Sequence, residues 1–425
     1  MLTIQYTKQK EVTHMRTIGI FSRTMFKAWF VTVLLVSVLI MAGCSSNDSS
    51  TTPVPGTLGV SLTDAPACGF DAVNVTVSKV RVHQSSSATE NDADWHDITL
   101  NPARKINLLN LTNGALETLG ETSLPAGHYT QLRLVLAENT GSSIANSVVS
   151  SGTTTEIALV TPSAVQSGIK LINEFDVASG QRVDLVLDFD ACKSVVTRGN
   201  GSYGLKPVIK VSPFVVLNGI VVLNGINGFI DTRILDTNVV VSAQVNGTEV
   251  RSTVPNAQTG EFFLARLDAP VNYDVVITAD GRATAVIAGV PISSTTSTAT
   301  VSTSDSPITL PASPTRNISG MVLLKPPSPD EIAYVAAKQT FTAGPTVTVK
   351  SQGVDLLSSA YSLTLPVAAP LLGYYGKGIL PITLTAQDAA AGQYSVEAYA
   401  IGYQTQSVDK DISVADETQY FTLIP

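Results

Sequence analysis

Apolar side chains recur at every second position along much of this chain. In 132–136 and in 182–189, for example, apolar residues alternate with other side chains. A period of two places alternate side chains on opposite faces of a strand, whereas a helix needs a period near 3.6. Stretches of helical period are scarce, and alternation of this kind is typical of antiparallel sheets with one face in water. The pattern therefore predicts a mainly β protein.

The first predicted domain extends over residues 56–213 and is an antiparallel, β-rich domain with a short helix. Two valine runs within 73–82 differ in phase by one residue, so we expect a β-bulge near Ser78 that keeps both runs on the core face. A turn is expected at 63–66. Thr112 is the expected N-cap of a helix that continues to Leu119. The predicted strands are 58–62, 73–82, 95–100, 132–136, 156–160, 182–189 and 207–211.

Two smaller modules, at 228–311 and 317–425, repeat a similar order of short strands. We expect both to be small β-sandwiches of the immunoglobulin or transthyretin type. Residues 328–338 are expected to form one short helix, because Ser328 is followed by a proline and an acidic residue. The segment 366–380 is expected to be a long loop. The predicted strands of the modules are 239–243, 250–254, 262–264 and 273–278, then 318–323, 346–350 and 392–398.

Two connecting segments leave alternatives open. Residues 215–226 repeat the hexapeptide VVLNGI. Its Asn-Gly pairs favour hairpin turns between edge strands, and a duplicated linker is the alternative. The Ser/Thr-rich segment 293–306 is either a linker or a polar edge strand.

The beginning of the chain has the pattern of a secretory signal. Basic residues precede an apolar run, 28–44, that ends in small residues and one cysteine. The run is short for a bilayer span, which needs roughly 20 apolar residues, although a retained anchor helix is the alternative. We interpret 1–43 as the signal peptide, with Met1 or Met15 as the start, and 44–55 as a Ser/Thr/Pro spacer.

The end of the apolar run carries a resemblance of its own. The sequence LIMAGC, at 39–44, resembles the bacterial lipobox, with Met41 where that motif more often has Leu. The resemblance implies that Cys44 is lipidated and becomes the new N-terminus. It also implies that Ser45 directs the protein to the outer membrane of a Gram-negative cell.

Charge narrows the range of partners. The whole chain has 26 basic and 34 acidic residues. Loss of residues 1–43 would remove five basic residues and one acidic residue, which leaves a net charge of −12. An acidic surface of this kind repels nucleic acid and anionic lipid. We therefore expect the membrane, through the N-terminal lipid, and a glycan or an envelope protein as partners, and no nucleic acid.

Five ordered segments of the first domain resemble the domain-of-unknown-function family 4382. That family occurs in lipoproteins of the bacterial and archaeal cell envelope, so the resemblance implies an envelope-located, β-rich domain without an established activity. The segments are SLTDAPA (61–67), VNVTVSKVRVH (73–83), LPAGHYTQLRL (124–134), VLDFDACKSV (186–195) and YGLKPVIKV (203–211).

The last module carries a second resemblance. The sequence AYAIGY, at 398–403, resembles the closing motif of carboxypeptidase regulatory-like sandwiches, which are related to transthyretin. Residues 280–282, Asp-Gly-Arg, are a looser counterpart in the preceding module. The resemblance implies that both modules are sandwiches of this type.

Two cysteines, Cys68 and Cys192, remain once Cys44 is assigned to lipidation. An even number of cysteines in an oxidising compartment suggests one disulfide, with two free buried thiols as the alternative. In the terms of the family resemblance, a Cys68–Cys192 bond would join the TDAP segment to the DFD segment.

The sequence contains few candidates for chemistry. It has no GxSxG, no P-loop and no His or Cys pair with zinc spacing. Asp188 and Asp190 share a strand face and, with Asp64 or Asp71 nearby, provide oxygen ligands of the kind calcium prefers. The alternative is that these residues face solvent or cap turns. His128 is interpreted as a turn residue.

Aromatic residues suggest one further site. Trp95, Tyr374 and Tyr375 are candidates for a platform on which a sugar ring stacks, although packing roles for all three are the simpler interpretation.

These observations favour a non-catalytic, lipid-anchored protein of the cell envelope that displays β-domains for binding or adhesion. We expect no cofactor. The opposing hypothesis is a calcium-dependent binder or a hydrolase centred on Asp64, Asp188, Asp190 and His128 in the first domain.

The lipid anchor leads to a direct prediction. Protein extracted from membranes should have the mass of a chain that begins at Cys44 and carries acyl chains, because the lipobox resemblance implies both cleavage and lipidation. Intact-mass spectrometry measures this. An unmodified Cys44 would contradict the prediction.

Overall fold

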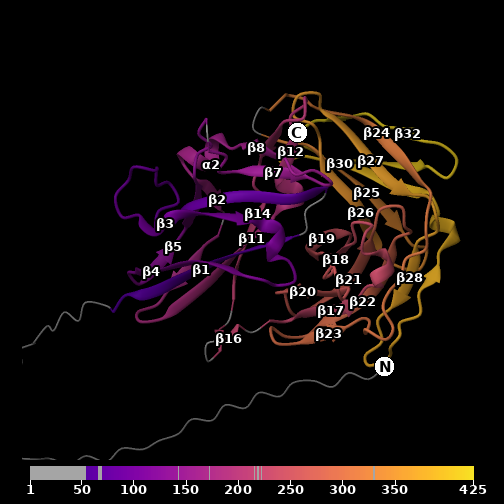
Figure 1. Ribbon diagram of the computed structural model, residues 1–425, viewed down its shortest axis with the longest axis horizontal. Coiled ribbons are helices and arrows are strands. Elements are labelled where there is room, and N and C mark those ends of the chain that lie inside the picture. Colours follow the sequence, from indigo (N-terminus) through magenta and orange to yellow (C-terminus); the bar gives the residue numbers. More distant parts are fainter. Residues whose placement is uncertain are drawn as a thin grey trace, which may run out of the picture. The chain divides into compact units, whose positions relative to one another are not determined.

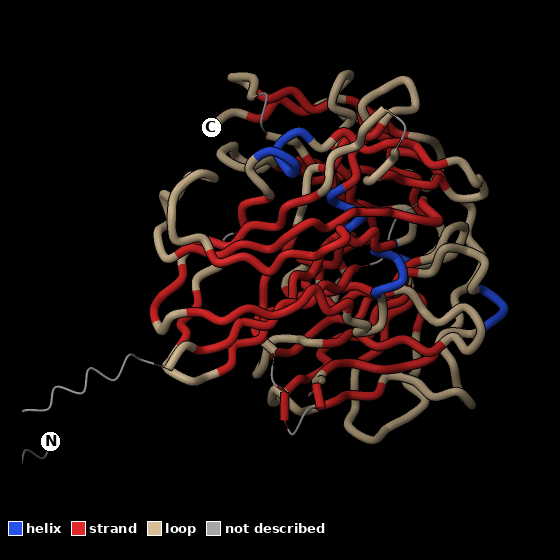
Figure 2. Tube along the Cα trace, turned by 60° about the vertical axis from the view of Figure 1, so that its left-hand side comes forward, coloured by secondary structure: helices blue, strands red, loops and turns tan. Residues whose placement is uncertain are grey.

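Strands dominate the computed structural model, and its helices are few and short (Figures 1 and 2). The mainly β prediction is confirmed. The structure describes residues 54–425 except 66–68, 142, 172, 215, 218–219, 222 and 329–330. The described residues belong to one compact unit, Pro53–Pro425. The signal segment, Cys44 and Cys68 lie outside them.

The first domain contains three sheets around one hydrophobic core. Their strand orders are β14-β11-β1-β4, β10-β5, and β12-β13-β8-β7-β2-β6-β9 with β3 paired to β2. The strands are β1 (Gly56–Ala65), β2 (Phe70–His83), β3 (His96–Asn107), β4 (Glu117–Leu124), β5 (Gly127–Tyr129), β6 (Gln131–Leu136), β7 (Ser147–Ser150), β8 (Glu156–Val160), β9 (Ile169–Leu171), β10 (Phe175–Val177), β11 (Arg182–Asp190), β12 (Val195–Thr197), β13 (Tyr203–Leu205) and β14 (Ile209–Pro213); the helices are η1 (Leu108–Leu111), α2 (Pro162–Gln166) and α3 (Ala191–Ser194).

The predicted bulge in β2 is confirmed. The register of β2 with β3 and with β6 shifts between Val77 and Lys79. The shift brings the two valine runs onto the same face, because an extra residue reverses the alternation of side chains. All five valines of the two runs, at 73, 75, 77, 80 and 82, are buried in the core.

Two expectations for the first domain are wrong. The turn expected at 63–66 is strand as far as Ala65, because β1 pairs with β11 up to Ala65 and Asp190. This pair is parallel, so the domain is not purely antiparallel. The helix expected from Thr112 to Leu119 is also absent: Thr112 ends η1, and Glu117–Leu124 forms β4, which pairs with β1. Gly120 adopts a φ of 141° beside the register shift in β1, a conformation that favours glycine.

The second module packs a three-stranded sheet against a six-stranded sheet. Their orders are β20-β17-β23 and β19-β18-β21-β22-β28-β29, and side chains from both sheets share one core. The elements are β17 (Gly225–Phe229), η2 (Thr232–Ile234), β18 (Val240–Val245), β19 (Thr248–Thr253), β20 (Glu261–Ala265), β21 (Val271–Thr278), β22 (Ala285–Ile292) and β23 (Thr298–Thr300).

The two connecting segments, 215–226 and 293–306, both contain strands. In the hexapeptide repeat, β15 (Val216–Leu217) pairs antiparallel with β16 (Ile220–Val221), which confirms the hairpin alternative. In the Ser/Thr-rich segment, β23 is an edge strand that pairs with β17, so the edge-strand alternative is confirmed for 298–300.

The third module has its own core between two four-stranded sheets. Their orders are β26-β25-β30-β31 and β27-β24-β32, with β33 also paired to β24. The elements are β24 (Thr315–Leu324), β25 (Tyr334–Thr340), β26 (Thr346–Gly353), β27 (Ala360–Pro366), β28 (Leu371–Tyr374), β29 (Thr385–Ala386), η3 (Asp388–Ala390), β30 (Gln393–Tyr399), β31 (Gln406–Asp411), β32 (Glu417–Thr418) and β33 (Phe421–Leu423).

Two expectations for this module are also wrong. Tyr334–Thr340, most of which was expected to be helical, forms β25 between β26 and β30. Val335 and Ala337 are buried in the core, and pairing on both sides outweighs the local helix signal. The segment expected to be a loop contains β28, which lies beside β22 of the second module as a parallel strand (Figure 1).

The second and third modules make further contacts. A small apolar cluster combines Val276 and Val286 with Phe341, Val347 and Leu372. The Gln244 side chain donates to the Thr348 carbonyl oxygen at 2.7 Å and accepts from its backbone N–H at 2.8 Å. These contacts, together with β28, tie the two modules to each other.

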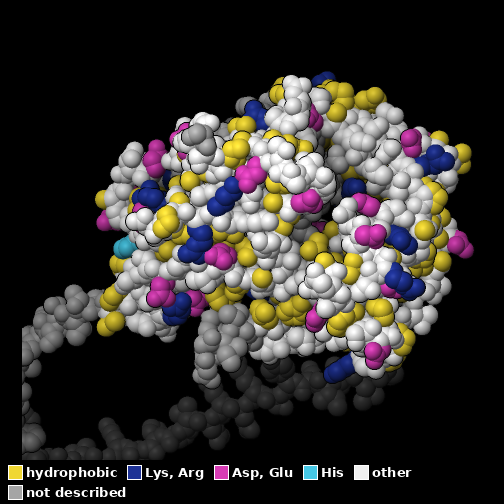
Figure 3. All heavy atoms as spheres, viewed as in Figure 1, with side chains coloured by type: hydrophobic (Ala, Val, Ile, Leu, Met, Phe, Trp, Pro, Cys, Tyr) yellow, Lys and Arg dark blue, Asp and Glu magenta, His cyan; other side chains and the backbone are white. Residues whose placement is uncertain are grey.

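On the face shown in Figure 3, basic and acidic side chains are interspersed. Apolar side chains lie among them in small groups. Within the described part of the chain, no helix is both long and apolar enough to cross a membrane.

Candidate functional site

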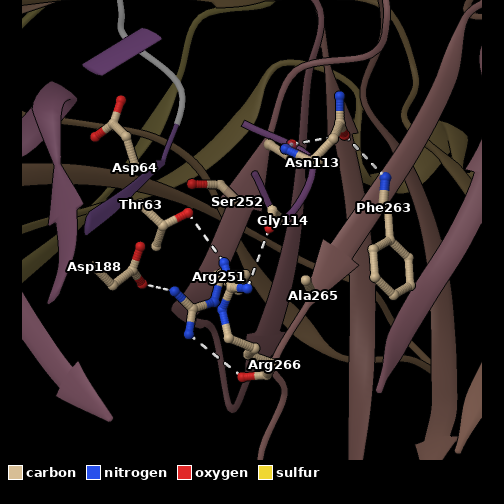
Figure 4. A pocket seen from close by; sticks show the side chains of 11 residues that line it. Thr63, Asp64, Asn113, Gly114, Asp188, Arg251, Ser252, Phe263, Ala265 and Arg266 are labelled. Atoms are coloured by element: carbon tan, nitrogen blue, oxygen red, sulfur yellow. Dashed lines mark hydrogen bonds and ion pairs between the residues drawn. The ribbon is translucent and has the colours of Figure 1, made fainter. Parts of the chain in front are cut away.

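Two of the acidic residues singled out in the sequence, Asp64 and Asp188, lie where the first domain meets the second module (Figure 4). β1 and β11 run in parallel, so Asp64 and Asp188 lie near the same ends of neighbouring strands. Asp188 forms an ion pair with Arg251 on β19, and the two side chains are only 11% and 7% exposed. Burial lowers the pKa of Arg251 to about 10, with a smaller contribution from the neighbouring Arg266. Arg251 therefore keeps its charge at neutral pH, and Asp188 balances it.

A second arginine of the same module reaches into the first domain. The Arg266 guanidinium donates to the Gly114 carbonyl oxygen at 3.2 Å and to the Thr63 hydroxyl at 3.0 Å. Burial lowers the pKa of Arg266 to about 10. The two arginines thus bring positive charge from the second module against polar groups of the first.

Asn113 makes the neutral part of this interface. Its side-chain oxygen accepts from the Phe263 backbone N–H at 3.0 Å and from the Thr253 hydroxyl at 2.9 Å. Its side-chain nitrogen donates to the Val254 carbonyl oxygen at 2.9 Å. Asn113 has a φ of 56° in the turn after η1, where asparagine is one of the few residues tolerated. One side chain thereby satisfies backbone and hydroxyl groups of two strands in the second module.

Asp190 and its neighbours extend the interface to the third module. The Asp190 side chain caps α3 by accepting from the Lys193 backbone N–H, and it lies 2.6 Å from the Lys193 ammonium. The same ammonium lies 3.0 Å from Glu249 of the second module, and Tyr334 of the third donates to the Lys193 carbonyl oxygen at 3.3 Å. Burial acts to lower the pKa of Lys193, but Glu249 and Asp190 outweigh it and raise that pKa above its usual range.

The space at the centre of this interface is very small. The cavity lined by Asp64, Asp188, Arg251 and their neighbours has a volume of about 10 Å³, which is room for about one water molecule. Asp64 accepts from the Ala191 backbone N–H at 3.1 Å. Within the described ranges, no group of three or more His, Cys, Asp or Glu residues is placed to hold a metal ion. The arrangement joins the first domain to the second module around a space for about one water molecule.

His128 lies elsewhere in the first domain, on β5. Its Nδ1 is 2.8 Å from Asp176 and its Nε2 is 3.5 Å from Glu174, both on the surface. The hydrogen bond to Asp176 raises the pKa of His128. His128 is therefore not brought into the interface that contains Asp64, Asp188 and Asp190.

The aromatic candidates are engaged in separate contacts. The Trp95 ring lies 4.7 Å from the Arg81 guanidinium carbon and 4.9 Å from that of Arg133, and its Nε1 donates to the Thr89 carbonyl oxygen at 2.8 Å. Tyr375 packs against the core of the second module, whereas Tyr374, at the end of β28, is 57% exposed. Cys192 lies in α3, and its predicted bond to Cys68, a residue outside the described ranges, stays a prediction.

Three residues of the interface between the first domain and the second module were not predicted from the sequence. Arg251, Arg266 and Asn113 belong to no recognisable motif. The sequence contains no signal for Arg251: in the predicted strand 250–254, alternation places it on the face opposite Val250 and Val254, where a charge is expected to meet solvent. The sequence therefore does not indicate a partner for Arg251.

The buried ion pair gives a prediction for stability. Asp188→Asn should lower the free energy of unfolding by about 3–5 kcal/mol, because it leaves the Arg251 charge buried without its counter-charge. Replacement of both residues, Asp188→Leu with Arg251→Met, should cost far less. Urea unfolding measures both, with Glu121→Gln in the exposed Arg182–Glu121 pair as the control, expected within about 1 kcal/mol of the native chain. Equal losses in Asp188→Asn and the control would contradict the prediction.

His128 gives a prediction for pH dependence. Because the pKa of His128 is raised in the folded chain, the stabilisation from its pair with Asp176 is complete below the usual pKa of 6.5 and is lost as pH rises through the folded value. Asp176→Asn should lower the His128 pKa towards its usual value. Titration of the His128 ring protons by NMR measures the shift. An unchanged His128 pKa would show that Asp176 does not stabilise the protonated imidazole ring.

Comparison with known families gives one match. Residues 55–207 match the family described as "Domain of unknown function (DUF4382)". The match confirms the resemblance of the first domain to this family, and it covers less than half of the chain. No curated protein sequence matches the chain.

Several solved structures are similar to the chain at low levels. The Bacillus anthracis TIE protein is 10% identical, with 87% of this chain and 50% of that chain covered and a TM-score of 0.16, so this chain spans half the length of that protein. The major pilin SpaA of Corynebacterium diphtheriae is 10% identical, with 87% and 100% covered and a TM-score of 0.19. Two B repeat units of the collagen binding protein of Staphylococcus aureus are 12% identical, with 88% and 98% covered and a TM-score of 0.15. At such TM-scores, no conclusion about this chain follows from the similarity.

Proposed function

We propose that this chain is a non-catalytic protein of the cell envelope whose β-domains are held together to present a binding surface. The observation that carries the proposal is the buried Asp188–Arg251 pair. Asp188 is neutralised by Arg251 of the neighbouring module, and Asp190 is neutralised by Lys193, which also contacts Glu249 of that module, so both carboxylates serve to fix one domain against the next. A fixed arrangement of domains suits display and recognition.

The proposed attachment is a lipid on Cys44, in an outer membrane, with 44–55 as the spacer. The support is the basic, apolar and small-residue pattern that ends in LIMAGC. We also propose that the second and third modules belong to the carboxypeptidase regulatory-like sandwiches, on the basis of AYAIGY at 398–403. In this arrangement the first domain follows the spacer and the two sandwiches complete the displayed unit.

The proposed binding surface is the outer face of β24 and β33 in the third module. Val322 pairs with Phe421, and both are buried, so the preceding residues, Met321 and Tyr420, are neighbours on the opposite face. Met321 is 37% exposed and Tyr420 is 65% exposed. Leu323, two residues further along β24, is 44% exposed on the same face. The three large side chains form an apolar group on an open sheet.

Several polar side chains beside this apolar group are uncharged. On the outer face of β24 and its neighbours β27 and β32, they include Ser319, Ser362, Thr364 and Thr418, whereas Lys325, two residues after Leu323, is charged and exposed. An apolar group that contains Tyr and Met and has few charges around it resembles the centre of a protein–protein interface. Of the two ligand classes expected from the sequence, this surface favours a protein over a glycan.

The proposal is tested with the chain from Ser45 to Pro425, immobilised and exposed to cell-envelope proteins. Captured proteins are identified by mass spectrometry, and a glycan array is probed in parallel. We expect Met321→Ser with Tyr420→Ser to reduce capture of a specific protein at least tenfold, because hot-spot residues of this type dominate interfaces.

The matched control is Val414→Ser, which removes an apolar side chain that is 81% exposed in the turn before β32. Its capture should equal that of the native chain. Equal capture by all three chains would contradict the proposed surface. Binding to the glycan array without capture of a protein would show that the displayed surface binds a sugar.

A further inference from the structure

The second module contains an apolar cleft of about 440 Å³, within the range of roughly 300–1,000 Å³ typical of small-molecule sites. Its origin lies in the unequal sheets of the sandwich. The six-stranded sheet includes β28 and β29 from the third module, whereas the facing sheet has only three strands. The larger sheet therefore extends beyond its partner, and the cleft lies where no strand covers it.

The floor of the cleft consists of core residues. Ile287 on β22 is fully buried, and Val301 and Ile308, which follow β23, are 1% and 7% exposed. The walls come from Leu371 on β28 and from the segment 381–384, whose apolar side chains are half-buried against the same core. Because the floor residues expose little surface, the apolar surface that a ligand contacts comes mainly from the half-buried side chains of the walls.

The segment 381–384 packs directly over β28. A Cβ atom at Gly373 would lie 2.8 Å from the Thr383 carbonyl oxygen and 2.9 Å from side-chain atoms of Ile382 and Leu384. Such an approach requires a glycine. The wall that this segment forms is therefore held against the sheet.

The chemistry of the lining restricts the ligand. None of the twelve lining residues is charged, aromatic or an amide. An ion would lose its hydration without a counter-charge, and a sugar ring would find neither a stacking partner nor amide groups. The hydroxyl of Ser302 is already bound to the backbone of Phe229, at 2.7 and 2.9 Å. Polar groups for a ligand thus come from Ser306 and Thr309, and Thr309 is exposed at the rim.

We propose that this cleft binds a single alkyl chain, such as that of a fatty acid or a monoacylglycerol, with its polar end at the rim near Thr309. Burial of apolar surface supplies the driving force, and the aliphatic lining imposes no charge requirement. The inference goes beyond the proposed display function. The cleft lies in the second module, away from the β24–β33 surface of the third. The alkyl-chain proposal and the display proposal can therefore be refuted independently.

The test uses the chain from Ser45 to Pro425, which contains the whole compact unit, in detergent-free buffer with cis-parinaric acid as the fluorescent probe. We expect a saturable rise in probe fluorescence with one site per chain. Dodecanoic acid and the uncharged 1-monododecanoylglycerol should both displace the probe, because the alkyl chain is the shared element. Thr309→Trp should weaken probe binding at least tenfold by filling the mouth of the cleft.

The control variant is Thr154→Trp, which adds the same ring at an exposed threonine just before β8 in the first domain, outside the lining and outside the β24–β33 surface, and should bind as the native chain does. Ile382→Gln is the second cleft variant, and a native urea midpoint shows that each variant is folded. Absence of a fluorescence rise, or native affinity in both cleft variants, would overturn the proposal. Displacement by dodecanoic acid but not by the monoacylglycerol would place recognition in the carboxylate and would also overturn it.

Discussion

A buried pair of opposite charges, Asp188 and Arg251, constrains how the first domain meets the second module. Removal of a guanidinium from water costs several kcal/mol, and only a well-placed carboxylate with additional hydrogen bonds offsets that cost. Any other relative position of the two domains would leave Arg251 buried without a counter-charge or expose the surface around it. The pair therefore contributes less to net stability than to the choice of one arrangement.

The neighbouring contacts depend on that arrangement. Asn113 satisfies groups on two strands of the second module, and Arg266 reaches Gly114 and Thr63. Each of these bonds requires the first domain to lie within about 0.5 Å of its correct position, since hydrogen bonds weaken steeply with distance and angle. Lys193 then links the same region to Glu249 and, through its carbonyl oxygen, to Tyr334. The network includes the first domain and both modules. This explains why ionisable side chains that could take part in catalysis serve as structural contacts.

The second module depends on its neighbour in another way. Its larger sheet is completed by β28, a strand that belongs to the third module by its position in the sequence. A strand contributed in this way satisfies the backbone groups at the edge of β22, which would otherwise be open to pairing with another chain. It also produces the mismatch between six strands and three that leaves the aliphatic cleft open. One topological feature thus both closes an edge and creates a candidate binding site.

Sequence alone was enough for the mainly β character, the positions of strongly alternating strands such as β2, β6 and β11, and the bulge in β2, because side-chain alternation is a local property. Local helix-start signals gave wrong predictions where pairing between neighbouring strands competed with helix formation. Thr112 and the Ser328-Pro pair are good helix starts, yet Glu117–Leu124 and Tyr334–Thr340 are strands, because neighbouring strands supply more hydrogen bonds and burial than a short helix. The sequence also identified Asp64, Asp188 and Asp190 as unusual. Only the tertiary structure decided their role, since Arg251 lies 63 residues after Asp188 in the sequence and no local pattern relates the two. Their pairing is a consequence of domain packing, in which a buried charge must find its opposite.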